Sequence, residues 1–454
     1  MDRTQKLSQR ISYALLALIL TCTAASALDR QPNADYHARR QALAEKIKDG
    51  VVILFAPTEA EGPNDLFGFR QDDNFYYLTG WAEPGAAIVI APAAPAKDGN
   101  PARAYTEILY LPAHNVVEEK WTGPKLGPDS PDAAKSTGFD RVEVIDKLRD
   151  DLQSLLPKER ITIYSDLPSF GEPSPSSEPL NWLKRSNAFP GFVSFKDVKP
   201  MLSTLRTTKD AGEIHLTRKA VDASAAGHLA AMHAVKPGVT EREIASLLQY
   251  EYGKRGCERS AYAPIVGSGF NSTVLHYSDD SGTMKDGDVV VIDAAGEYSM
   301  YAADITRTLP INGKFTARQR EIYGIVLGAQ QAAERAFILG KSNLRRDDPD
   351  SLYKAAYDYI NTHGKDLHGQ PLGKYFIHGL SHYIGLNVHD PGDYSMALQK
   401  GMAFTIEPGI YIPEEKLGVR IEDDYLVDSD GKLVKLSATL PSTADQVEQA
   451  MGGK

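Results

Sequence analysis

Short apolar runs alternate with longer amphipathic stretches along the first half of this chain. The runs have the length and the β-branched or aromatic content typical of buried strands. They are VVILFA (51–56), NFYYLTGW (74–81), AAIVIAP (86–92), TEILYLP (106–112) and ITIYSD (161–166). Apolar residues at helical spacing predict helices over 34–48 and 146–156. Because the predicted strands and helices alternate, we expect an α/β domain here.

Helix starts mark the second half of the chain. Three residue pairs predict capping boxes, in which a first residue caps the helix and a Glu or Gln three positions later bonds back to it. The pairs are Asp210 with Glu213, Thr240 with Glu243, and Thr316 with Gln319. A fourth helix is predicted to start at Asp348–Pro349. Strand-like runs separate these helices, which indicates an α+β domain beginning near Met201.

Five potential metal ligands stand in or beside apolar runs of this second half. The runs VVVIDAAG, YAADITRT, GMAFTIEPG and GVRIEDD, together with HGLSH, carry Asp293, Asp304, His382, Glu407 and Glu422. Burying ionised carboxylates is costly, and clustering them is costlier still, so such groups are protonated, paired or metal-bound. Two divalent cations would neutralise four carboxylates. Oxygen-rich ligands with one imidazole favour manganese, with cobalt, zinc or iron as alternatives.

Any one of these acids, taken alone, is more often a cap, a turn residue or half of a surface ion pair. The order of the residues along the chain favours a shared metal-binding role. Asp293 ends an apolar run, Gly296 is expected to allow a turn, and Asp304 follows on the predicted return strand of a hairpin. Both carboxylates could then face one pocket.

Three further histidines, His276, His378 and His389, would each be taken alone as structural residues. His378 precedes His382 by four positions, which places both on one side if the segment is helical, as in HExxH metal sites. The intervening Gly-Leu-Ser lacks the glutamate base of those zinc peptidases. That class of peptidase is therefore excluded.

Length and charge fit a two-domain enzyme that does not act on nucleic acid. A chain of 454 residues exceeds what one hydrophobic core usually supports. The formal net charge of −10, with no block of basic residues, disfavours nucleic acid as a partner.

The first 27 residues resemble a secretory signal peptide, because Arg3, Lys6 and Arg10 precede an apolar stretch that ends in small residues at 25–27. An uncleaved membrane anchor is the competing interpretation, but the apolar stretch is short for one. Cleavage would give a periplasmic or secreted protein without stable membrane association. It would remove one acid and three bases, so the net charge would become −12. Cys257 would remain alone, and we expect a buried, inert thiol.

Longer motifs resemble the successive signatures of the pita-bread metallopeptidases, and within them the aminopeptidase P and prolidase branch. The motifs are VVVIDAAGEYSMYAADITRTLPINGKFT, HGLSHYIGLNVHDPG, MAFTIEPGIYI and GVRIEDD. The resemblance implies a pita-bread catalytic domain over 201–454, preceded by a smaller α/β domain of the creatinase and aminopeptidase P type over 28–200. It also implies that two metal ions are bound by Asp293, Asp304, His382, Glu407 and Glu422.

The same resemblance implies roles around the metals. Residues matching His276, His378 and His389 line the substrate pocket, orient the scissile carbonyl and assist proton transfer. Glu407 is expected to act as both ligand and proton shuttle, and Arg420 to organise the site through hydrogen bonds. A hydroxide held between the two metals would attack the peptide carbonyl, so no covalent nucleophile is needed.

The segment FRQDDNFYYLTGWAEPGA resembles the amino-terminal domain of aminopeptidase P. The expected activity is therefore release of the first residue from peptides that have proline second. A prolidase, restricted to Xaa-Pro dipeptides, is the nearest alternative, and a non-catalytic peptide-binding protein of the same fold is another. The resemblance also implies a homodimer or homotetramer. The native metal, the preferred first residue and the physiological peptide stay open.

Overall fold

The structure is a computed structural model that describes residues 29–47, 50–59, 68–96, 102–156, 160–169, 174–189 and 191–452. The predicted signal peptide, residues 1–27, lies outside the described residues and stays a prediction. Within the described ranges, no helix combines the length and the apolar character needed to cross a bilayer.

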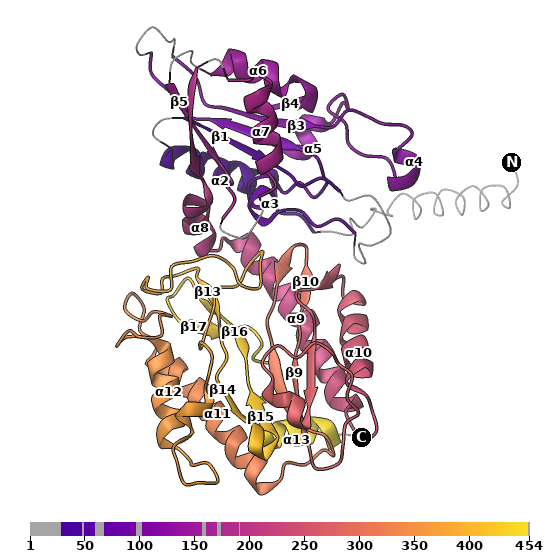
Figure 1. Cartoon of the computed structure of the whole chain (residues 1–454), viewed down its shortest axis with the longest axis vertical. Helices are drawn as coiled ribbons and strands as arrows, with labels where there is room; N and C mark the ends of the chain where they lie inside the picture. The colour runs from indigo at the N-terminus through magenta and orange to yellow at the C-terminus, as the bar shows by residue number, and fades with distance from the viewer. Residues whose placement is uncertain are drawn as a thin grey trace, which may run out of the picture. The chain divides into compact units, whose positions relative to one another are not determined.

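A six-stranded mixed sheet forms the centre of the amino-terminal part (Figure 1). Its strands, in spatial order, are β4 (Arg141–Val144), β3 (Thr106–Leu111), β2 (Ala87–Ala91), β1 (Val51–Phe55), β5 (Arg160–Ser165) and β6 (Phe192–Asp197). β2 pairs antiparallel with both β1 and β3, and the other neighbours pair in parallel. The apolar runs at β1, β2, β3 and β5 are therefore strands, as predicted.

Helices cover both faces of this sheet. In β1, Val52 and Leu54 belong to one apolar cluster, whereas Val51 and Ile53 belong to another. The first cluster includes side chains of α2 (Asn33–Lys46), α3 (Asp73–Thr79) and α8 (Lys199–Thr207), and the second those of α6 (Leu148–Leu155) and α7 (Ser177–Arg185). Short α4 (Glu119–Thr122), α5 (Ala133–Thr137) and η1 (Ile145–Lys147) complete this part. The central strands are uninterrupted apolar runs because both of their faces are buried.

The run NFYYLTGW forms helix α3, so the strand predicted there is wrong. Asp72 caps its first turn by accepting a hydrogen bond from the backbone N–H of Phe75 at 2.9 Å. Gly80 ends the helix in the left-handed conformation, with φ of 59°. Aromatic composition favours a strand, but a cap at each end and burial of the aromatic rings stabilise a short helix instead.

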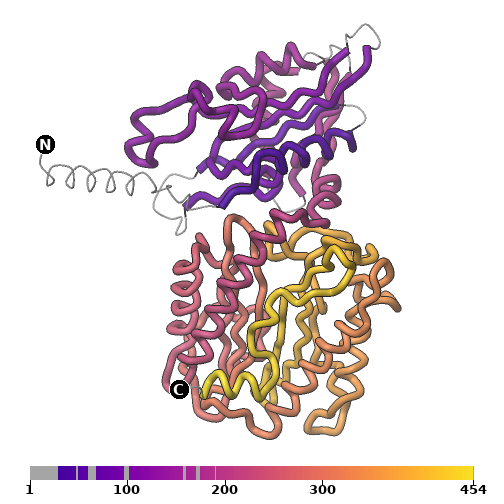
Figure 2. The backbone as a smooth tube through the Cα atoms, turned by 180° about the vertical axis from the view of Figure 1, so that it is seen from behind, coloured from indigo at the N-terminus to yellow at the C-terminus, as the bar shows by residue number. Residues whose placement is uncertain are grey.

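The carboxyl-terminal part places small sheets between two pairs of long helices. Helices α9 (Ala211–Ala234) and α10 (Glu241–Gly253) lie on one side of the strands, and α11 (Ala317–Ala336) and α12 (Leu352–Thr362) lie on the other (Figures 1 and 2). The sheets have the strand orders β11-β10-β7, β12-β9-β8, β13-β16-β17 and β14-β15.

The strands of this part are β7 (Arg259–Ser260), β8 (Ile265–Ser268), β9 (Val289–Asp293), β10 (Gly296–Tyr298), β11 (Tyr301–Ala302), β12 (Thr306–Pro310), β13 (Ala403–Ile406), β14 (Gly409–Ile412), β15 (Leu417–Arg420), β16 (Asp423–Val427) and β17 (Leu433–Lys435). The shorter helical segments are η2 (Gly269–Thr273), η3 (Leu372–Tyr375), η4 (Pro413–Glu415) and α13 (Ala444–Gly452). The mixture of segregated helices and antiparallel strands is the α+β arrangement expected from the sequence.

The three predicted capping boxes are confirmed at α9, α10 and α11. At α11, Thr316 Oγ1 accepts the N–H of Gln319 at 3.2 Å, and Gln319 Oε1 accepts the N–H of Thr316 at 2.9 Å. Helix α12 starts later than predicted. Ser351, rather than Asp348, caps it by accepting the N–H of Tyr353.

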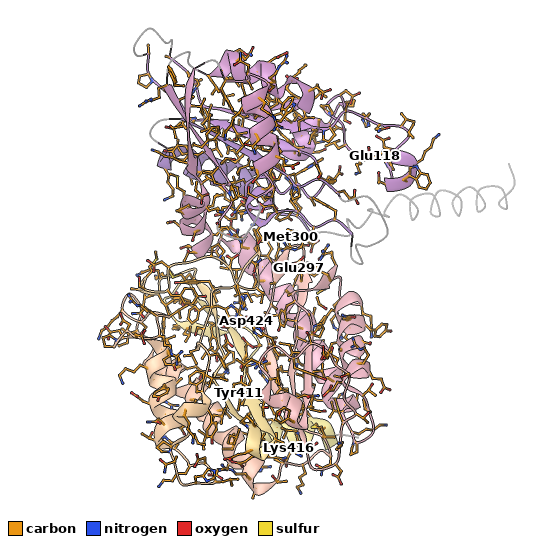
Figure 3. The ribbon with its side chains drawn as sticks, viewed as in Figure 1. Glu118, Glu297, Met300, Tyr411, Lys416 and Asp424 are labelled. Carbon is orange, nitrogen blue, oxygen red and sulfur yellow. The ribbon has the colours of Figure 1, made fainter. Side chains whose placement is uncertain are left out.

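The predicted hairpin around Asp293 and Asp304 forms, but its turn lies farther along the chain. β9 pairs antiparallel with β12, and the chain between them continues as β10 and β11, so Asp304 precedes β12. The turn consists of Ser299 and Met300, whose φ values of 48° and 72° suit a two-residue type I′ turn. Figure 3 labels Met300 at this tip.

Gly296 lies in β10 and does not make the predicted turn. A Cβ atom there would lie 2.7 Å from Cys257 Sγ, so glycine allows close packing at this position. Cys257 is a buried free cysteine, and burial raises its pKa to about 12. The expectation of a buried thiol is confirmed.

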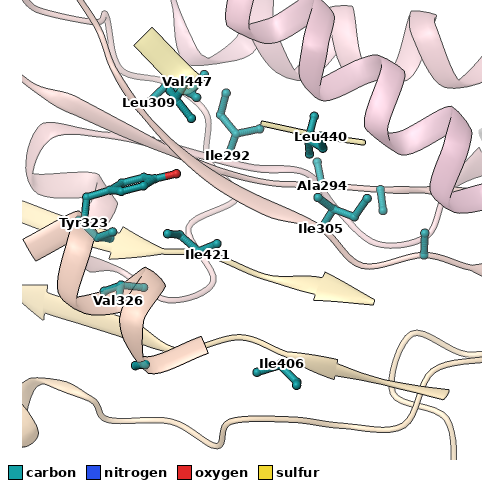
Figure 4. Close-up of a cluster of buried hydrophobic side chains, with 14 of the residues drawn as sticks. Ile292, Ala294, Ile305, Leu309, Tyr323, Val326, Ile406, Ile421, Leu440 and Val447 are labelled. Carbon is teal, nitrogen blue, oxygen red and sulfur yellow. The ribbon is translucent and has the colours of Figure 1, made fainter. Parts of the chain in front are cut away.

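A cluster of buried apolar side chains lies in the carboxyl-terminal part (Figure 4). It buries the sequence neighbours of the predicted ligands, namely Ile292, Ala294, Ile305, Ile406 and Ile421. Successive side chains of an extended segment point to opposite faces. Burying these neighbours on one face therefore turns the carboxylates toward the other.

The predicted domain boundary near Met201 falls inside α8. Leu202 of that helix is buried in the same cluster as Leu43 and Phe75, so α8 packs with the amino-terminal elements. The domain limits drawn from the sequence stay a prediction.

Candidate metal centre

All nine residues predicted for the site line one cavity of about 560 Å³. They are His276, Asp293, Asp304, His378, His382, His389, Glu407, Arg420 and Glu422. Residues far apart in the sequence meet here, because the β9–β12 hairpin, the chain after η3 and the strands β13 to β16 each supply part of the lining. Their individual roles stay predictions, whereas their convergence is a property of the fold.

Asp304, His382 and Glu422 form the tightest group of possible ligands. One ligand atom from each residue lies within 4.8 Å of the other two. His382 Nε2 is 3.3 Å from Asp304 Oδ2 and 3.9 Å from Glu422 Oε1. Two carboxylate oxygens and one imidazole nitrogen at this spacing are a suitable donor set for a divalent cation.

Glu407 and Asp293 lie beside this group. Glu407 Oε1 is 3.6 Å from His382 Nε2. The hydroxyl of Tyr262 reaches Asp293 Oδ1 at 2.6 Å and Asp304 Oδ1 at 2.5 Å. A hydroxyl has one proton to donate, so Tyr262 satisfies one of these carboxylates at a time. The other needs a second proton or a cation.

Four carboxylates share this cavity with a single guanidinium group. Among the described lining residues, Arg420 is the one arginine, and no lysine accompanies it. Burial raises the pKa of Glu422 well above its usual value, and the charges of Asp304 and Glu407 raise it further. Burial also raises the pKa of Asp304 and of Glu407. The donor set therefore fits divalent cations, which would supply the positive charge that the side chains do not.

His382 is affected by the same negative charge. Burial alone would lower its pKa, but the hydrogen bond to Asp304 and the charge of Glu407 outweigh burial and raise the pKa to about 9. Its Nδ1 lies 3.1 Å from the carbonyl oxygen of Tyr383. A carbonyl can only accept, so Nδ1 carries the hydrogen and Nε2 faces the acids, as in metal-binding histidines.

The segment that carries His378 and His382 is not helical, so the condition for the two histidines to share one helical face is not met. Its backbone bonds to strand β13 instead of to itself: the N–H of Thr405 donates to the carbonyl of His382 at 2.9 Å. The N–H of Glu407 donates to the carbonyl of Leu380, also at 2.9 Å. The two histidines reach the cavity from an irregular chain beside β13.

His378 belongs to a chain of hydrogen bonds. Its Nδ1 lies 2.7 Å from the carbonyl oxygen of Gly379, so Nδ1 donates and Nε2 accepts from the Tyr411 hydroxyl at 2.9 Å. The Tyr411 oxygen in turn accepts from Arg420 Nη1 at 2.8 Å. Burial lowers the pKa of His378 to about 4, so the ring is neutral at pH 7.

Arg420 also joins separate parts of the cavity wall. Its Nη2 donates to Asp293 Oδ2 at 2.6 Å and to the carbonyl of Leu275 at 3.4 Å. Leu275 precedes His276 on the loop that follows η2. Across the cavity wall, the ring of His389 packs edge-on against that of His382, with centroids 4.4 Å apart.

The loop that carries His389 is anchored on α8 and the residues that follow it. The next residue, Asp390, is buried, and it accepts hydrogen bonds from Arg206 at 2.5 Å and from Lys209 at 2.8 Å. Burial opposes ionisation of Asp390, but these two cations outweigh it and lower the pKa of the carboxyl. An ion cluster therefore fixes the backbone beside a cavity residue.

Sequence reasoning misses several residues that organise the site. The hydroxyl of Thr306 donates to Glu422 Oε2 at 2.6 Å. Its position two residues after Asp304 places both on one face of an extended strand, so period-two spacing could have found it. Tyr262 and Tyr411 have no sequence spacing from the predicted ligands that would identify them. They come close to the site only in the folded chain.

Two sequence families match this chain. Residues 36–164 match the aminopeptidase P amino-terminal domain, and residues 215–429 match metallopeptidase family M24. A Xaa-Pro aminopeptidase of Haemophilus influenzae is 32% identical over 447 residues, covering 92% of this chain and 97% of that protein.

Solved structures agree with these matches. Proline aminopeptidase P II from Yersinia pestis superposes with a TM-score of 0.80 and 30% identity, covering 93% of this chain and 100% of that one. Aminopeptidase P from Escherichia coli with the inhibitor Pro-Leu gives the same TM-score and identity, covering 93% and 99%.

Proposed function

The chain belongs to metallopeptidase family M24, in its aminopeptidase P branch, and on this premise we propose that it is a Xaa-Pro aminopeptidase that uses two divalent metal ions. The family, the pita-bread fold with its amino-terminal domain, and the metallo-aminopeptidase class predicted from the motifs are confirmed. In the proposed reaction, the first residue is released from a peptide whose second residue is proline. Manganese is the proposed metal, with cobalt, zinc and iron as alternatives.

One observation carries the proposal. Asp304, His382 and Glu422 offer three ligand atoms within 4.8 Å of one another, and Glu407 and Asp293 line the same cavity. The surrounding side chains do not balance so much negative charge. A pair of divalent ions would balance it and would leave room for substrate in the rest of the cavity.

The protein's own groups then have definite tasks. When bound, the metal ions would lower the pKa of water and polarise the peptide carbonyl. Glu407, whose pKa burial raises, is suited to take a proton from the attacking water and deliver it to the departing nitrogen. That nitrogen belongs to proline, and like any amide nitrogen it must gain a proton to leave as an amine.

The histidines divide into two kinds. Both ring nitrogens of His378 are engaged by Gly379 and Tyr411, so we assign it to shaping the pocket. His276 and His389 line the cavity on other segments, and we assign to them the contacts that orient the scissile carbonyl.

Prolidase activity is the alternative, and one observation weighs against it. A dipeptide carries its carboxylate next to the scissile bond and needs a cation there. Among the described lining residues the one permanent cation is Arg420, which already bonds to Asp293 and Tyr411. This cavity is therefore better suited to peptides that continue beyond proline.

The test is a comparison of three peptides. The mature chain is incubated with Mn²⁺ and Arg-Pro-Pro, Arg-Pro or Arg-Ala-Pro, and free arginine is measured. We expect rapid release from Arg-Pro-Pro, slower release from Arg-Pro and little from Arg-Ala-Pro. Release from the dipeptide alone would identify a prolidase. No release from either proline peptide with Mn²⁺, Co²⁺, Zn²⁺ or Fe²⁺ would contradict the proposal.

Export and self-association are proposed on the sequence and the resemblance. If residues 1–27 are a signal peptide, the protein recovered from the periplasm or medium should begin at Leu28. Amino-terminal sequencing that returns Met1 would contradict cleavage. A homodimer or homotetramer should be seen by light scattering at micromolar concentration, and a monomer there would contradict it.

A further inference from the structure

A buried carboxylate outside the cavity holds the loop that carries His276. Glu241, the first residue of α10, is fully buried and accepts five hydrogen bonds. On Oε1 the donors are Ser268 N at 2.8 Å, Ser268 Oγ at 2.7 Å and Asn271 Nδ2 at 3.1 Å. On Oε2 they are the Tyr277 hydroxyl at 2.8 Å and Gly282 N at 2.6 Å.

All five donors are uncharged groups of one chain segment, 268–282. Its middle supplies Leu275, His276 and Ser278 to the cavity. Burial would raise the pKa of Glu241, but the hydrogen bonds, those from Ser268 first, outweigh burial and lower it. The first turn of a helix also favours negative charge. An ionised carboxylate therefore bonds to both ends of the loop and to the residue next to His276.

The approach of the loop to Glu241 is close. A Cβ atom on Gly282 would lie 2.7 Å from both carboxylate oxygens of Glu241, so a side chain there would displace the carboxylate. The N–H of Glu241 also donates to the carbonyl of Gly282 at 3.0 Å. The end of the segment is thus bound to the start of α10 through backbone and side chain together.

The opposite side of the same loop rests on the strand that carries Arg420. Gly418 N donates to Ser272 Oγ at 2.8 Å, and a Cβ atom on Gly418 would lie only 1.9 Å from the Ser272 carbonyl oxygen. Arg420 bonds to the carbonyl of Leu275. The loop is therefore held between Glu241 on one side and strand β15 on the other.

We infer that Glu241 is a positioning residue, which sets the place of the His276 ring against the bound peptide by fixing both ends of the 268–282 loop. The inference rests on the proposed function in one respect, the contact between His276 and the scissile carbonyl. If the Glu241 carboxylate were purely structural, replacing it would change only the fraction of folded protein. A positioning carboxylate would affect catalysis through His276.

The main variant is Glu241→Gln, which keeps the shape but replaces one acceptor oxygen with an NH₂ group. Whichever way the amide turns, a loop N–H meets another donor. We expect kcat and kcat/KM for Arg-Pro-Pro to fall by the same factor, roughly tenfold to a hundredfold. Metal content should not change. Tyr277→Phe, which removes one hydroxyl donor, is the milder variant and should give a smaller loss.

Glu243→Gln is the matched control. Glu243 lies two residues along the same helix and bonds to Thr240 in the capping box. Glutamine also serves in a capping box, so the helix start is preserved. Activity of this variant should equal that of the unmodified protein.

A double-mutant cycle with His276→Ala separates positioning from general damage. If Glu241 acts through His276, Glu241→Gln should cost little further activity once His276 is alanine. A loss of folded protein would instead lower activity by the same factor in both backgrounds. The latter result would overturn the inference.

Hydrogen exchange keeps the inference separate from the proposed function. The amides of Ser268 and Gly282 bond directly to Glu241, so they should exchange faster in Glu241→Gln, whether or not the protein cleaves Xaa-Pro peptides. Unchanged exchange over 268–282 would refute the positioning role. Normal activity of His276→Ala would refute the assigned contact of His276, and with it the catalytic part of the inference.

Discussion

The surroundings of Glu422 define its chemistry at the scale of one residue. Its exposed fraction is 2%, its Oε2 accepts from Thr306, and its Oε1 faces His382 Nε2. Burial and the nearby charge of Asp304 raise its pKa well above the usual value. A raised pKa means that this carboxyl binds a proton more readily than an exposed glutamate does. A metal ion must therefore compete with protons for this site.

This competition predicts the pH dependence of metal binding. Carboxyls with raised pKa values bind protons in the metal-free protein, as Glu407 does with a pKa of about 7. His382, with a pKa of about 9, binds one too. Lowering the pH from about 8 to about 6 should therefore raise the apparent Kd for Mn²⁺, with protons released on binding. Calorimetry in two buffers of different ionisation heat measures both effects. A pH-independent Kd would contradict this prediction.

Removing one ligand should separate activity from folding. In Asp304→Ala and in Glu422→Ala, we expect turnover to be abolished and bound metal to decrease. The metal-free variants should still fold, because the apolar cluster formed by the sequence neighbours of these residues is left intact. Activity, metal analysis and thermal unfolding test this together. Asp430→Ala, an exposed acid on the β16–β17 connection, is the control and should change none of the three.

The convergence of the predicted ligands on one cavity follows from the sequence, because each stands next to an apolar residue that must be buried. Ile292 and Ile406 are in the core, so Asp293 and Glu407 cannot be there too. The same reasoning cannot find Tyr262, whose link to the ligands exists only after β8 and β9 pair. Sequence reasoning also fails to predict that the segment carrying His378 is not helical, because the backbone of this segment bonds to β13 instead of forming a helix.

Among the elements, α3 shows why a composition of strand-forming residues is not decisive. Tyr76 and Tyr77 favour a strand, but Asp72 and Gly80 cap a helix at its two ends. Strand β1 is predicted correctly because its apolar run has no caps and both of its faces are covered. Capping residues at the ends of a segment and burial of its side chains together determine whether it forms a helix or a strand. Only the capping residues can be recognised from the neighbouring sequence.

The capping box of α11 gives a stability prediction. In Thr316→Ala the N–H of Gln319 loses its acceptor, and the free energy of unfolding should fall by about 1 kcal/mol. Urea unfolding of the two proteins measures the difference. Thr316→Ser keeps the hydroxyl and should lie within a few tenths of a kcal/mol of the parent. Equal losses in both variants would show that the methyl group, not the cap, is responsible.

At the scale of the whole molecule, the turn at Ser299 and Met300 connects the two halves of the sequence. Met300 and Tyr301 are buried in the same apolar cluster as Phe75 and Leu109 of the amino-terminal sheet region. This hairpin holds two predicted ligands at its base. The residues at its tip therefore pack against the amino-terminal part of the chain. Sequence patterns alone predict each half, but not this shared core.

Truncation tests the shared core. A chain that starts at residue 209 would expose Leu216, Met300, Tyr301 and Leu386, which belong to this cluster. We expect it to aggregate or to bind a hydrophobic dye, because large exposed apolar patches promote association. Size-exclusion chromatography with light scattering measures this. Replacing Met300 and Leu386 with glutamine in the truncated chain should reduce aggregation. A well-behaved, active truncated chain would contradict the prediction.

The ion cluster at Asp390 has a consequence for how the substrate range of this enzyme could change. Arg206 and Lys209 are not among the residues that line the cavity, yet they fix the backbone beside His389. In a laboratory evolution experiment that selects for new peptides, we therefore expect beneficial substitutions on α8 as well as in the pocket wall. Diversifying only the residues that meet the substrate would miss this route.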